Sequence, residues 1–286
     1  ASAGFVVNLA LPQAWRMSFF ALLSLAGVFI VFEPNDGVWL IGSGLLLIGL
    51  CHLPLPTSGR LLLIAAVGAA LAAARAGAVT TPWSALVWPI LGSMFMFRLF
   101  IYIQAIKNEP RQGRFWAALG YFFMFPNLVF PLFPVIDYLT FRRTHFDKDS
   151  IAIYQQGVMW IVRGLLHLIL YRLVYHRLLI DPIDVDSLGD VVQAMLSTFL
   201  LYLRVSGSFH LIIGLLHLFG FRLPETHKLY YLSHNFTELW RRINIYWKDF
   251  IQKLFFNPAY FALSKKLSTR GAMVVATLFA FFFTWI

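Results

Sequence analysis

The chain has 286 residues, of which 59% are hydrophobic and only 13% are charged, about half the charged fraction of an ordinary globular domain. This composition excludes a soluble enzyme and indicates an all-α, polytopic integral membrane protein. The formal net charge of +10 would suggest nucleic acid in a soluble chain. Here the basic residues stand between apolar runs, where membrane orientation and anionic lipid headgroups explain them, so we expect no nucleic-acid partner.

Apolar runs, each close to the length of a membrane span, occupy the first third of the chain. They cover residues 17–32, 38–53, 61–79 and 83–106. Basic residues at Arg16, Arg60 and from Lys107 to Arg114 alternate along the chain with an acidic turn at 33–36 and a turn at 80–82. By the positive-inside rule, the basic loops are predicted to be cytoplasmic.

A proline-rich segment follows. Residues 115–136 contain Pro126, Pro131 and Pro134, which disfavour one straight helix. The basic cluster at 142–145 obeys the positive-inside rule if this segment is a re-entrant hairpin that returns to the cytoplasmic side. Irregular backbone at membrane depth is tolerated only inside protein or beside a cavity, so we expect the segment to line a cavity. An ordinary kinked span is the alternative.

The next two predicted spans, residues 151–180 and 191–219, carry ionisable side chains. His210 and His217 are seven residues apart and share a helix face. With His167 they suggest either a polar network within the bundle or a metal or proton-relay site. Because the sequence contains no HExxH motif and no paired cysteines, we expect a polar network and no bound metal.

An amphipathic cytoplasmic helix is predicted to begin at Asn235, which can cap a helix start. Apolar residues then recur at steps of three and four on one face. They are Phe236, Trp240, Ile243, Trp247, Phe250 and Leu254. Pro258 is expected to stop this helix, because the residue before a proline disfavours the helical region. Asn244 lies at the edge of the apolar face.

Two blocks around this helix resemble a known family. Residues 219–225 (FGFRLPE) and 238–244 (ELWRRIN) are similar to the signature of the membrane-bound O-acyltransferase (MBOAT) family. The likeness is closest to the bacterial branch that acylates cell-surface polymers. Residues 125–134 (FPNLVFPLFP) resemble the proline-rich segment of that branch. The resemblance runs from about residue 121 to residue 255, roughly half of the chain.

The resemblance implies transfer of an acyl group, often acetyl, from a cytoplasmic thioester to a hydroxyl. The donor would be acyl-CoA or an acyl carrier, used as a substrate rather than a bound cofactor. The acceptor would be an envelope polysaccharide, another polymer or a lipid. The implied partners are membrane lipids, this acceptor and other envelope-assembly proteins, in the bacterial cytoplasmic membrane.

The resemblance also implies roles for particular residues. Asn244 stands at the position where the family has Asn or His, and is the implied catalytic residue that orients the reactants. Arg241 and Arg242 are expected either to bind a donor phosphate or to contact lipid headgroups. Trp240 and Trp247 are expected either to wall an acyl channel or to serve in packing. The remaining substrate-binding candidate is His210, at a position where this branch often has an acidic residue.

The family uses a histidine in a later transmembrane helix as general base, yet no histidine follows His234 in this sequence. The last apolar run, from Gly271, is short for a span. We therefore expect residues 1–286 to be a single polytopic domain that is cut short at its C-terminal end. Two alternatives to an enzyme stay open. One is a non-catalytic membrane subunit on the same scaffold that binds lipid or a partner protein, and the other is a transporter.

Overall fold

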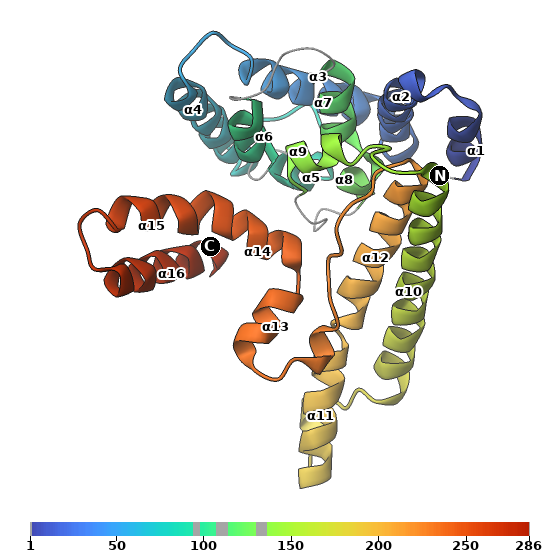
Figure 1. Ribbon diagram of the computed structural model, residues 1–286, viewed down its shortest axis with the longest axis vertical. Helices are drawn as coiled ribbons and strands as arrows, with labels where there is room; N and C mark the ends of the chain where they lie inside the picture. Colours follow the sequence, from blue (N-terminus) through green and yellow to red (C-terminus); the bar gives the residue numbers. More distant parts are fainter. Residues whose placement is uncertain (1, 94–97, 107–113, 130–135, 286) are drawn as a thin grey trace. The chain divides into compact units, whose positions relative to one another are not determined.

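The structure is a computed structural model that describes residues 2–93, 98–106, 114–129 and 136–285. Within these ranges every regular element is a helix, so the predicted all-α class is confirmed. The chain divides into two compact units, Ala1–Arg143 and Thr144–Ile286. Figure 1 shows the helices of both units in the colours of the sequence.

Among the described residues, four helices are long and apolar enough to cross a membrane. They are Gln13–Val31, Thr57–Arg75, Ser150–Arg177 and Leu188–Leu218. Each overlaps a predicted span, which supports the assignment as a membrane protein on length and composition. The orientation and the re-entrant hairpin stay predictions. The predicted basic loop at Lys107 and Arg111, and the prolines at 131 and 134, lie outside the described residues.

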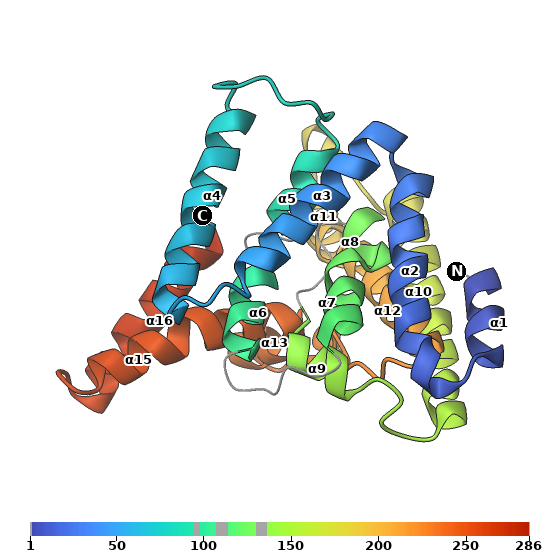
Figure 2. The same ribbon diagram turned by 90° about the horizontal axis from the view of Figure 1, so that it is seen from above.

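The first unit contains helices α1 to α9. Their bounds are Ser2–Ala10, Gln13–Val31, Pro34–Leu50, Thr57–Arg75, Val87–Ser93, Leu99–Ile106, Arg114–Phe123, Phe125–Val129 and Tyr138–Arg143. Helices α2 and α7 pack side by side, as both views show (Figures 1 and 2). The core of this unit is aromatic: the rings of Tyr102 and Tyr138 lie 4.7 Å apart, and the hydroxyl of Tyr121 donates to the carbonyl of Ile136 at 2.6 Å. This bond satisfies a hydroxyl that burial would otherwise penalise.

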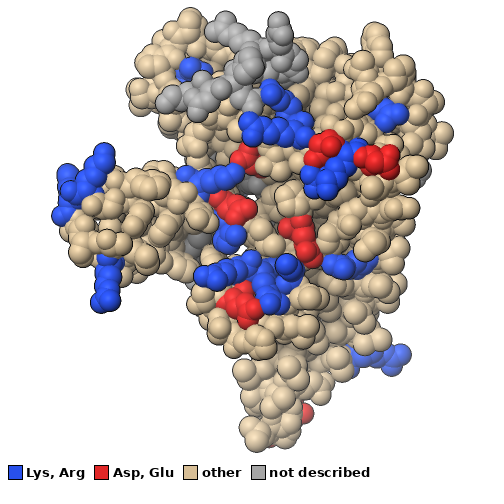
Figure 3. Space-filling view, in the orientation of Figure 1, with Lys and Arg blue, Asp and Glu red and all other residues tan. Residues whose placement is uncertain are grey.

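The second unit contains α10 to α16. The bounds of the α-helices are Ser150–Arg177, Leu188–Leu200, Leu203–Leu218, Phe236–Arg242, Ile245–Ile251, Asn257–Leu263 and Thr269–Trp285. Short 3₁₀ turns at Pro182–Asp184 (η2) and Tyr230–Leu232 (η3) and a π-helical turn at Gln252–Phe256 (η4) complete it. Helices α15 and α16 pack together. The surface over α11, at the bottom of the view, is almost entirely uncharged, as expected for an apolar membrane helix (Figure 3).

Helices α10 and α12 run antiparallel and touch through their backbones at four glycines. Gly157 of α10 faces Gly214 of α12, and Gly164 faces Gly207. A Cβ on Gly164 would lie 2.7 Å from the backbone nitrogen of Leu211. On each helix the two glycines are seven residues apart, two helical turns, so they share one face. Small residues let apolar helices pack closely in a membrane, where the hydrophobic effect gives no net attraction between them.

The predicted continuous helix from Asn235 to Asn257 is wrong. The chain folds as two helices, α13 and α14, with a break at Ile243 and Asn244. Asn235 does cap α13, accepting from the backbone N–H of Glu238 at 2.8 Å. Pro258 does not end the helix either, because it occupies the first turn of α15, where a missing N–H leaves no bond unmade.

Candidate functional site

Asn244 forms a left-handed turn that starts α14. Its φ of 43° lies in the region that Asn tolerates better than most residues. Its side-chain oxygen accepts from the backbone N–H of Trp247 at 3.3 Å, which makes Asn244 the N-cap of α14. The apolar repeat continued through this position, but the cap ends one helix and begins another. We refer to residues 242–246 as the Asn244 turn.

The capping bond orients the amide of Asn244. Because the oxygen faces the start of α14, the NH₂ group points elsewhere, and it has no hydrogen-bond partner among the described residues. The residue is half-buried. The site therefore presents a fixed amide donor, held by the backbone of the helix that it caps.

The chain just after the first block that resembles the family signature is hydrogen-bonded to the end of the second block and the residues that follow it. The N–H of Lys228 donates to the carbonyl of Arg242 at 3.0 Å, and the N–H of Ile245 donates to the carbonyl of Thr226 at 2.8 Å. The hydroxyl of Tyr246 donates to the carbonyl of Pro224 at 2.8 Å. These three bonds hold the Asn244 turn beside the segment that follows the Leu-Pro-Glu sequence.

Arg241 and Arg242, predicted together, have different surroundings. Arg242 is paired with Glu238 one turn earlier and donates to the carbonyl of Leu229 at 3.4 Å. Arg241 is exposed and makes no hydrogen bond or ion pair with a described residue. Of the two, Arg241 is the guanidinium that remains available to a phosphate.

The two predicted tryptophans are half-buried, each against a phenylalanine. Trp240 lies 5.6 Å from Phe281 of α16, measured between ring centroids. Trp247 stacks on Phe250 at 5.2 Å. Both rings are therefore fixed by packing and are partly exposed. The two residues lie on either side of Asn244 in the sequence.

His210 belongs to a group of histidines that the structure brings together in the second unit. Its ring stacks on Trp160 at 5.1 Å and meets the ring of His167 edge-on at 5.2 Å and that of His227 at 5.8 Å. We refer to His167, His210 and His227 as the histidine cluster. His217, which the sequence pattern grouped with His167 and His210, instead packs against Gly157, two turns further along α12.

Hydroxyl groups link the histidine cluster. His167 Nδ1 lies 2.9 Å from Ser206 Oγ, which lies 3.0 Å from the hydroxyl of Tyr230. His227 Nε2 lies 2.9 Å from the hydroxyl of Tyr202. The predicted polar network is present. No group of described His, Cys, Asp or Glu residues could hold a metal ion.

The histidine cluster is connected to the Asn244 turn through Thr226. Its hydroxyl lies 3.0 Å from His227 Nδ1, and its carbonyl accepts from Ile245. Burial, reinforced by His210 and His167, lowers the pKa of His227 to about 3, so its imidazole is neutral at physiological pH. His227 is not predicted by the sequence pattern, because it lies in a loop, where no helical spacing groups it with the other two histidines.

Glu225 of the first motif block pairs with Arg163 of α10 at 3.2 Å. The guanidinium of Arg163 also lies over the ring of Trp160, 4.7 Å from its centroid. An arginine within a membrane helix needs such partners, since an isolated charge there is costly. This pair ties the Leu-Pro-Glu segment to the helix that carries His167.

Residue 220, in the same block, must be glycine because of its backbone conformation and its contact with Phe146. The φ of Gly220 is +89°, and a Cβ there would lie 2.1 Å from Cε2 of Phe146. The N–H of Phe146 donates to the carbonyl of Gly220 at 2.8 Å, and the N–H of Arg222 donates to the carbonyl of Thr144 at 3.1 Å. Arg222 also binds Asp147, its Nε donating to the two carboxylate oxygens at 3.0 and 3.1 Å.

We expect the Asp147–Arg222 pair to make the stability of the fold depend on pH. Hydrogen bonds from Arg222 hold the pKa of Asp147 below its ordinary value of 3.8. A lowered folded-state pKa stabilises the fold above pH 3.8, and the stabilisation disappears as the pH falls through the folded-state value. We expect Asp147→Asn to cost about 1 kcal/mol at pH 7, the upper end for an exposed bidentate pair.

The measurement is the thermal midpoint of the detergent-solubilised protein from pH 7 to pH 3. The gap between wild type and Asp147→Asn should narrow as the pH falls. Asp149→Asn is the matched control, because asparagine caps α10 as well as aspartate does. A gap of constant size across this range would show that the ion pair is not its cause.

A comparison with protein-family models and with curated proteins finds no match to this chain. The fold and the membrane-length helices define the class as an all-α membrane protein.

Proposed function

We propose that this membrane protein transfers an acyl group from a thioester to a hydroxyl, with the Asn244 turn at the reaction site. The observation that supports this proposal is the hydrogen bonding between residues 224–228 and residues 242–246, at the ends of the two motif blocks. Residues 14 to 22 positions apart meet through three hydrogen bonds, and the turn that these bonds hold presents one oriented amide donor. A turn that is fixed by hydrogen bonds before and after Asn244 can hold that side chain in a constant position relative to two reactants, which favours their reaction.

In the proposed reaction the hydroxyl oxygen attacks the carbonyl carbon of the thioester. The hydroxyl proton passes to a base, the carbon–sulfur bond breaks, and the departing sulfur takes up that proton to leave as the thiol. Negative charge develops on the carbonyl oxygen as the new ester bond forms. The NH₂ of Asn244 would donate a hydrogen bond to that oxygen, a contribution worth about 10²- to 10³-fold in rate for one donor.

Arg241 would bind the donor. Coenzyme A and phosphopantetheine both carry phosphate, and an exposed arginine without a protein partner suits a phosphate. Arg241 lies three residues before Asn244, within reach of the same elongated donor. Trp240 and Trp247 would give the acyl portion an apolar contact.

The proposal is tested by following both halves of the donor. Membranes that carry the protein are supplied with a thioester labelled in its acyl group, together with envelope extract. We expect alkali-labile label in the acceptor and one free thiol for each acyl group transferred. Uptake of label without thiol release would indicate a transporter, and neither uptake nor release would indicate a non-catalytic subunit.

A further inference from the structure

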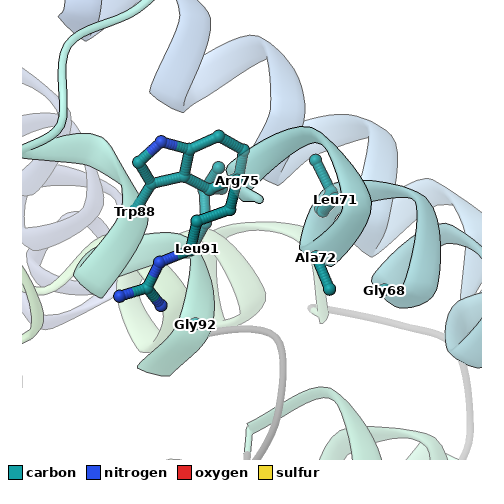
Figure 4. A pocket seen from close by; sticks show the side chains of 7 residues that line it. All are labelled: Gly68, Leu71, Ala72, Arg75, Trp88, Leu91 and Gly92. Carbon is teal, nitrogen blue, oxygen red and sulfur yellow. The ribbon is translucent and has the colours of Figure 1, made fainter. Parts of the chain in front are cut away.

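A hollow of about 150 Å³ lies in the first unit between α4 and α5, away from the Asn244 turn in the sequence. Its lining residues are Gly68, Leu71, Ala72, Arg75, Trp88, Leu91 and Gly92. Figure 4 shows the α4 side chains on one wall and Trp88 and Leu91 on the other, with the guanidinium of Arg75 on the side of α5. A cavity of this size lined by apolar side chains accepts a benzene-sized hydrocarbon group.

The hollow exists because its walls carry little side-chain volume. A Cβ added to Gly92 would meet no described atom within 4 Å, and Ala72 adds only a methyl group opposite. The exposed surface of the lining is mostly apolar. Such a hollow suits a hydrocarbon chain better than water, since water needs several polar partners.

Of the described residues that line the hollow, Arg75 is the only charged one. It is exposed and makes no hydrogen bond or ion pair with a described residue. It is also the last residue of α4, whose 19 residues extend for about 28 Å, close to the thickness of the hydrocarbon core. Arg75 therefore lies at the end of a membrane-length helix, at the level expected for the lipid headgroups. No described acidic residue pairs with its charge.

Three tryptophans gather at the same end of the unit. The rings of Trp39 and Trp83 lie 5.8 Å apart, and those of Trp83 and Trp88 lie 5.4 Å apart. Asp36 holds this group in place by accepting from the backbone N–H of Ser84 at 2.9 Å. Tryptophan is enriched at the level of the lipid headgroups, which agrees with the position of Arg75.

Most of α4 is open to the membrane: only 6% of its span is buried. Lipid is therefore the available occupant of an apolar hollow on its surface. We propose that the hollow is a binding site for an anionic phospholipid, with one acyl chain between α4 and α5 and the headgroup phosphate on Arg75. This site is independent of the proposed acyl transfer.

The test is native mass spectrometry of the full chain in detergent, with phosphatidylglycerol and phosphatidylcholine of identical acyl chains added in turn. We expect phosphatidylglycerol to bind about fivefold more tightly, the contribution of one arginine near an anionic lipid surface. Arg75→Gln should abolish this preference, and Arg75→Lys should keep most of it. Gly92→Leu, which fills the hollow, should weaken both lipids equally.

Arg177→Gln is the matched control, since Arg177 is also an exposed arginine in the last turn of a membrane-length helix. It should leave the lipid preference unchanged. Three outcomes would overturn the proposal. They are a preference that survives Arg75→Gln, displacement of phosphatidylglycerol by inorganic phosphate, and binding of a second copy of the chain at the hollow in place of lipid.

Discussion

Gly164→Leu is expected to prevent stable folding of the second unit. The added side chain would begin 2.7 Å from the backbone nitrogen of Leu211 and 2.8 Å from the carbonyl oxygen of Gly207. Both are backbone atoms of α12, so no rotamer change can relieve the contact, and the helices must separate. We expect a loss of more than about 3 kcal/mol, beyond the usual cost of overpacking a core.

Thermal unfolding in detergent, followed by the loss of the monodisperse peak in size-exclusion chromatography, measures this effect. Gly42→Leu is the control, because it makes the same change in an apolar helix where a Cβ meets no atom within 4 Å. It should melt like the wild type. If Gly164→Leu also did so, the close contact between α10 and α12 would be refuted.

Separation of these helices would also dismantle the histidine cluster. His167 lies on α10 and reaches Ser206 and His210 on α12, so their contacts depend on the distance that the glycines permit. In the milder variant Gly207→Ala, a Cβ would lie 3.0 Å from both Gly164 and His167. Close packing at the glycines thus sets the geometry of the polar network.

The second large effect is expected at Asn244, in acyl transfer rather than in stability. Asp caps a helix about as well as Asn and also tolerates the left-handed region. Asn244→Asp should therefore fold normally, yet it removes the NH₂ donor and adds a negative charge beside the developing oxyanion. We expect acyl transfer to fall at least 100-fold.

Two variants separate the amide's roles at this turn. Asn244→Gly keeps the positive φ but loses both the cap and the donor, so it should lose transfer and a few tenths of a kcal/mol of stability. Asn235→Asp makes the same chemical change at the cap of α13 and should leave transfer unchanged. Equal losses in Asn235→Asp and Asn244→Asp would point to a general charge effect.

Much of the fold was predictable from hydrophobicity and helix signals. Four of the six predicted spans coincide with membrane-length helices, whereas, among the described residues, the runs at 38–53 and 83–106 do not, and Asn235 was correctly predicted as a cap. The shared face of His210 and His217 followed from their spacing, and both are buried on α12. These features depend on local periodicity, which a single sequence carries.

The break at Asn244 was not predictable in the same way. Apolar residues recur at helical spacing through Trp240, Ile243 and Trp247, so the periodicity alone suggests one continuous helix. Asn244 is a weak helix former and also a good cap, and the hydrogen bonds of Ile245 to Thr226 and of Lys228 to Arg242 decide between these roles. Those bonds come from a distant segment, which local patterns do not include.

Two other features depend on contacts between segments far apart in the sequence. The glycines at 157 and 164 of α10, and at 207 and 214 of α12, are each seven residues apart. This spacing is visible in the sequence, but it indicates close packing only once α10 and α12 are known to be neighbours. The boundary of the two units near Arg143 falls in a charged stretch, residues 142–149, which is like the other polar loops between apolar runs. Both required the three-dimensional structure.

The most direct test of the proposed acyl transfer at the Asn244 turn is the amount of ester-linked label formed by equal amounts of folded wild type and Asn244→Asp. Membranes with each protein receive the same labelled acyl thioester and envelope acceptor. We predict alkali-labile label for the wild type and at most a hundredth as much for the variant. Equal label from both proteins, or none from the wild type, would contradict the proposed function of this turn.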